Sequence, residues 1–280
     1  MTGTSNIVMD AVRAADPDRY LCALYAPADK RDALLALYAF NAEVASVRDR
    51  IHEPLPGEVR LQWWRDVIMA GAETGHPTAD ALRAAIAAND LPKTAFENML
   101  EARIFDLYDD PMPSRTDLEG YCGETAAALI QLAAMVLDAA EAPRFAELAG
   151  RAGCAQAITG LLLLLPLHRR RGQCYVPADI LAAAGTTPEE FVKGDGGPAA
   201  ERAVAAMIAL AREHLSAFEK GASALPASLR PAFLPLALTR AYLGKMERPG
   251  RSPLLGTAAL STLRRHWLLL RLAMRGWTPL

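Results

Sequence analysis

Residues 33–51, ALLALYAFNAEVASVRDRI, are the stretch of sequence that decides the fold. Alanine and leucine, which are strong helix formers, dominate this stretch, and β-branched residues are few. Asp29 precedes it as a candidate helix cap, and Pro54 follows it as a breaker. We therefore expect one long helix from Asp29 to about His52.

The same helical signals extend outward from this segment over the rest of the 280 residues. Aspartate, threonine and proline mark helix starts at 16–18 and 187–190, while no segment shows sustained strand alternation and no repeat has a fixed period. We also expect helices over about 58–70, 78–89, 92–108, 116–137, 143–165, 177–185, 199–221, 228–245 and 260–274, with a short extended piece at 173–177. Connections are short, so the sequence predicts one all-α domain over 1–280.

The composition indicates a large buried core and excludes two classes of protein. Hydrophobic residues make up 52% of the chain and charged residues 22%, which is too apolar for disorder. The formal net charge is −2, so no global basic field is available to hold nucleic acid. We expect no nucleic-acid partner.

The cysteines and the apolar segments point to the cytoplasm. Four cysteines contain no CxxC pair and no secretory signal precedes them, so we expect reduced core residues. The strongest apolar run, Leu161 to Leu165, is too short to cross a bilayer. The C-terminal stretch Leu254–Trp277 is apolar but contains Arg264, Arg265, Arg271 and Arg275. It fits an amphipathic helix on a membrane surface or a helix that closes the domain, and we favour the second.

Several short stretches, in their order and spacing, resemble the squalene/phytoene synthase family. They are Tyr20-Leu21, ALYAFN at 36–41, YCGETA at 121–126, Gly153-Cys154-Ala155 and RRGQCYVP at 170–177. The resemblance covers roughly 16–185 and is looser over 186–280. It implies an isoprenoid synthase fold, a helical bundle around a central cavity, whose active members join two prenyl diphosphates head to head.

Active members hold Mg²⁺ with two aspartate-rich motifs, each placing carboxylates at i and i+4 on one helix face. In this sequence the first motif falls on Ala45 and Asp49, and the second on Leu164 and His168. Only Asp49 is left as a metal ligand, so the resemblance implies no catalytic residue and no cofactor. We expect the four motif positions to face one another across the cavity.

Six other residues are candidates for binding a substrate or a lipid on the same resemblance: Tyr38, Asn41, Tyr121, Arg170, Arg171 and Tyr175. The basic run 168–171 fits a diphosphate or an anionic lipid head, and equally a solvated turn paired with acids. Of the adjacent Trp63 and Trp64, about 100° apart on a helix, at least one is expected in the core.

One branch of the family shares this loss of aspartates and assists assembly of respiratory complex I. The features in common are Ala39-Phe40-Asn41, the lone Asp49, Gln62-Trp63-Trp64 and Pro166-Leu167-His168. This resemblance implies a pseudoenzyme with a client subunit of a respiratory membrane complex as its partner. We keep the cytoplasmic location expected from the cysteines, with peripheral contact to the inner membrane and a bound prenyl lipid left open.

Two alternatives remain from the sequence. The chain could be an active prenyltransferase that condenses two prenyl diphosphates with Mg²⁺ held by unusual ligands such as Glu43, Asp49, Asp66 or Glu124. It could instead be an isoprenoid- or lipid-binding module that keeps the apolar tunnel without the chemistry.

Overall fold

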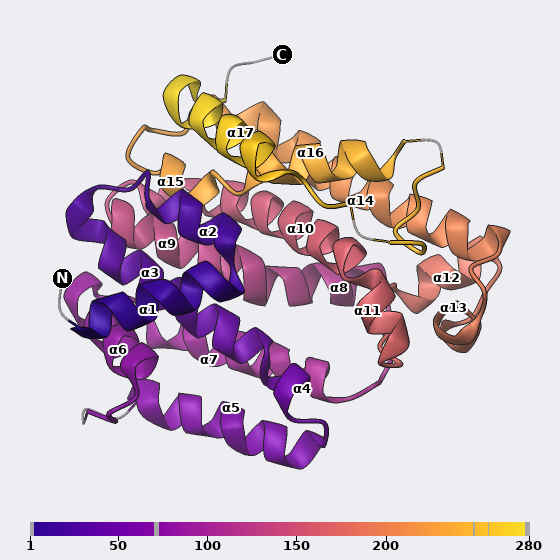
Figure 1. Cartoon of the computed structure of the whole chain (residues 1–280), viewed down its shortest axis with the longest axis horizontal. Helices are drawn as coiled ribbons and strands as arrows, with labels where there is room; N and C mark the ends of the chain where they lie inside the picture. The colour runs from indigo at the N-terminus through magenta and orange to yellow at the C-terminus, as the bar shows by residue number, and fades with distance from the viewer. Residues whose placement is uncertain (1–2, 70–72, 249, 257, 278–280) are drawn as a thin grey trace. The chain divides into compact units, whose positions relative to one another are not determined.

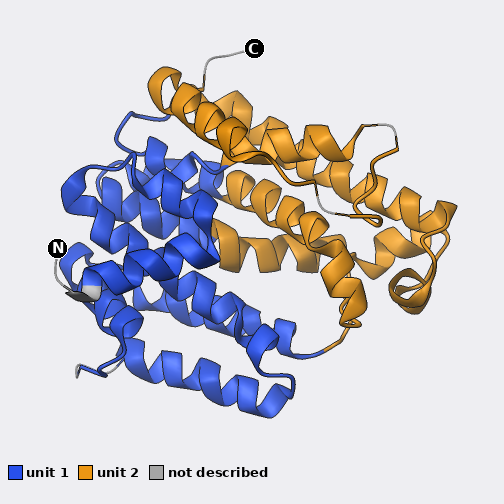
Figure 2. Ribbon diagram, in the orientation of Figure 1, with its two compact units in different colours: residues 1–108, 128–149, 225–235 blue, residues 109–127, 150–224, 236–280 orange. Residues whose placement is uncertain are grey.

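The computed structural model describes residues 3–69, 73–248, 250–256 and 258–277. Over these residues the chain consists of helices, most of them joined by short connections, and none of the described residues lies in a strand (Figure 1). The prediction of an all-α fold is confirmed. The chain divides into two compact units, coloured separately in Figure 2, and the prediction of a single domain stays a prediction.

The first unit comprises residues 1–108, 128–149 and 225–235. Its helices are α1 (Gly3–Ala15), α2 (Pro17–Ala23), α3 (Ala28–Ala45), α4 (Val47–Arg50), α5 (Pro54–Met69), α6 (Pro77–Asn89), α7 (Lys93–Ile104), η1 (Phe105–Leu107), α9 (Ala128–Leu137), η3 (Ala142–Phe145) and α15 (Arg230–Phe233). Helix α3 lies at the centre of the unit, because every residue from Leu34 to Asn41 is buried. The Phe40 ring packs edge-on against Trp64 of α5 and Phe96 of α7, with centroids 5.0 and 5.6 Å away.

The second unit comprises residues 109–127, 150–224 and 236–280. Its helices are α8 (Arg115–Cys122), the π-helical turn η2 (Gly123–Ala127), most of α10 (Ala146–Leu163), α11 (Leu165–Arg170), α12 (Ala178–Ala184), α13 (Pro188–Lys193), α14 (Pro198–Ala222), α16 (Leu236–Met246) and α17 (Thr262–Arg275). Helix α14 is amphipathic and buries one face, which includes Met207, Leu215 and Phe218. Helices α12 and α16 pack on α14, and α17 packs on α16.

Several helix ends follow the local signals of the sequence. The Asp16 carboxylate accepts a hydrogen bond from the Arg19 N–H at 2.9 Å, and Pro17 occupies the first turn of α2. Thr187 and Glu190 form a reciprocal capping box at the start of α13. Gly185 ends α12 in the left-handed conformation, with φ of 80°, which glycine adopts without a steric penalty.

Several local predictions were wrong, among them the single helix expected over 228–245, which is divided into α15 and α16. Residues before Asp16 were given no helix, but they form α1, whose Val8 and Val12 are buried. The next helix was expected from about residue 58, but α5 begins at Pro54, because proline lacks an N–H that the first turn of a helix leaves unbonded. The expected helix 29–52 is interrupted at Ser46, and Asp29 lies inside the first turn of α3 instead of capping it.

Two features bear on the predicted surroundings of the chain. All four cysteines (Cys22, Cys122, Cys154 and Cys174) are buried and unbridged, as predicted. The helical stretch Arg115–Leu137 has the length and the mean hydropathy, 1.3, of a membrane span, although 56% of its most apolar window is buried. A core helix has the same properties, and the burial of this one fits that description.

Candidate functional site

The first predicted motif lies where α3 ends. Ala45 is the last residue of α3, Ser46 separates the helices, and Asp49 lies exposed on the short helix α4. Ser46 has φ −90° and ψ 3°, and its hydroxyl donates a hydrogen bond to the Glu43 carbonyl at 2.9 Å. Ala45 and Asp49 therefore belong to two helical segments, and not to the one continuous helix that we expected.

The second predicted motif contains a break of the same kind. Leu164 separates α10 from α11 with φ −92° and ψ 1°, nearly the conformation of Ser46. This sparsely populated region of backbone dihedrals is common at functional sites. Leu164 is 48% exposed, whereas His168 on α11 is only 8% exposed. The two positions thus differ in surroundings, although both take the place of aspartates.

In the second unit, three of the predicted residues form an aromatic cluster. The His168 ring lies 4.7 Å from the Tyr175 ring, centroid to centroid, and the Tyr121 ring lies 6.1 Å from Tyr175. Tyr175 is buried and Tyr121 is half-buried. The resemblance proposed His168, Tyr121 and Tyr175 as site residues separately, and the structure brings them together.

The predicted basic run divides into residues with different roles. The Arg169 guanidinium donates to the Phe191 carbonyl at 2.9 Å and to the Gly194 carbonyl, and it lies 5.8 Å from the Phe191 ring centroid. Arg170 is exposed and Arg171 is half-buried. Arg169 therefore holds α13 to α11, whereas Arg170 and Arg171 remain anion-binding candidates on the resemblance alone.

In the first unit, the predicted binding residues Tyr38 and Asn41 are both buried. Burial raises the pKa of the Tyr38 hydroxyl well above its usual value, so this group is a neutral phenol at any physiological pH. The Arg19 guanidinium lies 6.0 Å from the Tyr38 ring centroid and pairs with Asp16 at 2.6 Å. The positive charge next to the Tyr38 phenol is therefore neutralised by the Asp16 carboxylate.

Carboxylates are scarce where the second metal motif would stand. Residues 148–178, which include most of α10 and all of α11, contain no aspartate or glutamate. Within the described part of the chain, no three His, Cys, Asp or Glu side chains gather in an arrangement that could hold a metal ion. Mg²⁺ requires several oxygen ligands, and the second motif supplies none from its side chains.

A cluster around Trp63 was only partly foreseen. Trp64 is fully buried, while Trp63 is half-buried and carries the Arg60 guanidinium 4.1 Å from its ring centroid. Glu43 of α3 reaches Arg60 at 3.5 Å and His76 at 3.6 Å. Glu43, one of the alternative metal ligands proposed from the sequence, thus lies between two basic side chains, an environment that favours an ion pair over a metal site.

A second cluster was missed by the sequence analysis. The buried His214 of α14 has its Nε2 atom 2.9 Å from the Glu119 carboxylate of α8, and Arg115 bridges Glu119 at 3.0 Å and Glu213 at 2.8 Å. The hydrogen bond from Arg115 lowers the pKa of Glu213. In the sequence, the only signal for this cluster is the i, i+4 spacing of Arg115 and Glu119. Its other members, on α14, are about 95 residues away along the chain.

The predicted site residues are divided between the units. Tyr38, Asn41, Ala45 and Asp49 belong to the first, and Tyr121, Leu164, His168, Arg170, Arg171 and Tyr175 to the second. The prediction that Ala45, Asp49, Leu164 and His168 face one another across a cavity stays a prediction.

The sequence model of the squalene/phytoene synthase family matches residues 12–271. NADH dehydrogenase (ubiquinone) complex I, assembly factor 6 of Bos taurus is 28% identical over 250 residues, which cover 88% of this chain and 75% of that protein. The protein of the same name from Rattus norvegicus is 29% identical over 243 residues, covering 86% and 73%. The Drosophila melanogaster homolog is 28% identical over 259 residues, covering 86% and 74%.

Solved structures give the same fold. A squalene synthase from Alicyclobacillus acidocaldarius superposes with a TM-score of 0.76 at 21% identity, covering 90% of this chain and 95% of that one. A dehydrosqualene synthase in complex with a ligand superposes with a TM-score of 0.84 at 17% identity, covering 97% and 95%. At these identities, the likeness establishes the helical fold and nothing further.

Proposed function

Because the chain belongs to the squalene/phytoene synthase family, we propose that it keeps the fold of that family without its condensation chemistry and assists assembly of respiratory complex I. The observation that carries this proposal is the similarity to proteins named as complex I assembly factor 6. That similarity extends over 250 residues of the bovine protein, so it includes far more than the short motifs.

The residues at the motif positions support the loss of chemistry. When an allylic diphosphate ionises, the leaving group carries several negative charges, which metal ions normally neutralise. The stretch 148–178 has no carboxylate to hold such an ion, and Asp49 is one exposed carboxylate on a short helix. We therefore assign the protein no Mg²⁺ cofactor and no prenyltransferase activity.

For the partner, we propose a subunit or subassembly of complex I. Complex I is a membrane enzyme, and a helper in its assembly has to meet its client at or near the bilayer. We place the protein in the cytoplasm, in peripheral contact with the inner membrane.

Deletion of the gene in its source organism tests the proposed function. We expect membrane NADH:quinone oxidoreductase activity and the intact complex I band on native gels to fall, and a plasmid copy of the gene to restore both. Normal complex I together with altered squalene- or phytoene-derived lipids would overturn the proposal in favour of a prenyltransferase.

An assay in vitro tests the chemistry separately. The purified protein is incubated with radiolabelled farnesyl or geranylgeranyl diphosphate and Mg²⁺. We expect no condensed product, and turnover on the order of 1 per second, which is ordinary for enzymes, would contradict the assignment.

A further inference from the structure

Helix α17 exposes a continuous apolar stripe. Four side chains at i, i+4, i+7 and i+11 form it: Leu263, Trp267, Leu270 and Met274, which are 84, 57, 48 and 75% exposed. At 100° per residue they fall within a narrow arc of the helix. The opposite side packs against the protein, where Leu269 is fully buried. Contiguous exposed apolar surface of this kind marks a binding face.

The charged side chains of α17 and of the residues that flank it in sequence are all basic. The last 33 residues, from Arg248 onward, contain six arginines and no aspartate or glutamate, although the whole chain has a net charge of −2. Arg264, Arg271 and Arg275 form a row directly beside the stripe, about 100° around the helix from Leu263. An apolar stripe with a basic border is typical of a helix that lies in a membrane interface.

The arginine row is available to an external anion. Among the described residues, Arg264, Arg271 and Arg275 have no carboxylate partner, and Arg271 lies 5.5 Å from the Trp267 ring centroid. By contrast, Arg240 on the neighbouring helix α16 is neutralised by a two-pronged pair with Glu219, at 2.8 Å and 2.5 Å.

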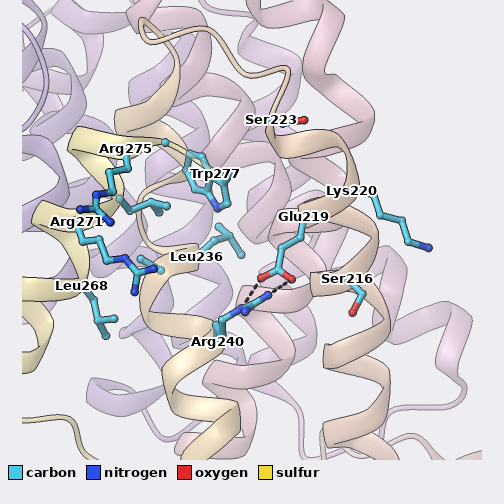
Figure 3. Close-up of a pocket in the computed structure, with 13 residues that line it drawn as sticks. Ser216, Glu219, Lys220, Ser223, Leu236, Arg240, Leu268, Arg271, Arg275 and Trp277 are labelled. Atoms are coloured by element: carbon cyan, nitrogen blue, oxygen red, sulfur yellow. Dashed lines mark hydrogen bonds and ion pairs between the residues drawn. The ribbon is translucent and has the colours of Figure 1, made fainter. Parts of the chain in front are cut away.

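Arg271 and Arg275 also line a cavity of about 470 Å³ between α14, α16 and α17. Figure 3 shows both arginines projecting from α17 along one side of the cavity, with the Arg240–Glu219 pair and Trp277 beside them. Leu236, Leu268 and Leu272 give it apolar walls. Arg271 and Arg275 therefore stand between this cavity and the exposed stripe.

We propose that α17 binds the anionic surface of a lipid bilayer, with the α17 stripe buried among the lipids and the arginine row paired with lipid phosphates. Tryptophan at position 267 suits the depth of the headgroups, where aromatic side chains concentrate. Each arginine near an anionic leaflet adds to the attraction, and salt weakens it. This inference extends the peripheral location proposed above and identifies the surface responsible.

Vesicle binding by the purified full-length protein tests the inference. We expect co-sedimentation with vesicles of phosphatidylcholine and phosphatidylglycerol, weaker binding to phosphatidylcholine alone, and release as salt is raised. Leu270→Glu with Met274→Glu removes two members of the stripe and should weaken binding about tenfold or more. Replacing the three arginines of the row by glutamine should weaken it on the order of a hundredfold.

The matched control is Leu55→Glu with Val59→Glu on α5. These side chains are 71 and 64% exposed and also one turn apart, but Arg60, the arginine next to Val59 in sequence, is paired with Glu43 at 3.5 Å. We expect this variant to bind vesicles as the wild type does. Equal loss in the control and the α17 variants, or no binding to anionic vesicles by the wild type, would overturn the inference.

Two other occupants of the stripe give different results. A second copy of the chain would appear as a dimer in light scattering that the Leu270→Glu, Met274→Glu variant makes monomeric, without vesicle binding. A protein client would leave vesicle binding absent while the same variant fails to restore complex I in the deletion strain. Vesicle binding needs no complex I, so this inference can fail while the proposed function stands, and the reverse also holds.

Discussion

The His168 ring lies 4.7 Å from the ring of Tyr175, at a position where the resemblance to active synthases would place a metal-binding aspartate. His168 is buried, while Leu164, one helical turn before it, is half exposed. Within the second motif, His168 has thus become part of an aromatic core cluster, whereas Leu164 still faces solvent. Restoring an aspartate should have different effects at the two positions.

We predict that His168→Asp lowers the free energy of unfolding by about 1–3 kcal/mol, because it buries a carboxylate against an aromatic ring. Leu164→Asp should cost less than about 1 kcal/mol at its exposed position. Urea unfolding followed by circular dichroism measures both. Equal stability of the two variants would show that the His168 site tolerates charge.

Gly153 on α10 lies against the π-helical turn η2, and a β-carbon at this position would clash with the backbone of Ala127. We predict that Gly153→Ala destabilises the protein by about 1–3 kcal/mol through overpacking. Gly160→Ala on the same helix is the matched control, because nothing lies within 4 Å of the added carbon there. It should stabilise by about 0.5–1 kcal/mol, since alanine is the better helix former. Thermal unfolding of both variants measures whether the melting temperature falls for Gly153→Ala and rises for Gly160→Ala, as we expect.

Arg169 and Arg170 are neighbours in sequence with different contacts. Removing the Arg169 guanidinium leaves the Phe191 carbonyl without its donor, so Arg169→Ala should cost about 1–2 kcal/mol and increase hydrogen exchange in α13. Arg170→Ala, at an exposed position, should stay within about 0.5 kcal/mol of wild type. Unchanged exchange in α13 after Arg169→Ala would contradict this assignment.

Asp80 gives the stability a dependence on pH. Hydrogen bonds from the Thr74 N–H above all, then from the Thr74 hydroxyl and the Gly75 N–H, lower the pKa of its carboxyl below the ordinary 3.8. The folded state therefore favours the charged form. This contribution is fully present above the ordinary pKa and is lost as the pH falls through the lowered one.

We expect Asp80→Asn to reduce the stability near pH 7 and to flatten its decline as the pH falls below the ordinary pKa of 3.8, as measured by melting temperature. Glu213 and Glu247, whose pKa values are lowered by hydrogen bonds from Arg115 and Arg212, add to the same decline. An Asp80→Asn variant with the full wild-type slope would exclude Asp80 as its source.

The helix ends that were predicted correctly are those with a local capping signal in the sequence. The Asp16 cap and the Thr187 capping box depend on hydrogen bonds between residues three apart, so they can be read without a tertiary structure. The break at Leu164 also has a local signal, because Pro166 occupies the first turn of α11. The break at Ser46 has none of this kind: no proline or glycine stands beside it, and its side chain does not cap α4.

By itself, the sequence determined that the chain is helical, which family it resembles and which aspartates are missing, because helix propensity, spacing and residue identity are local properties. Only the tertiary structure decided which side chains are buried. Trp277 packs edge-on against Phe218, with centroids 5.4 Å apart, while Trp267, ten residues earlier, stays exposed with the α17 stripe. Burial differs because it depends on the neighbouring helix that each side chain meets, and that helix comes from a distant part of the chain.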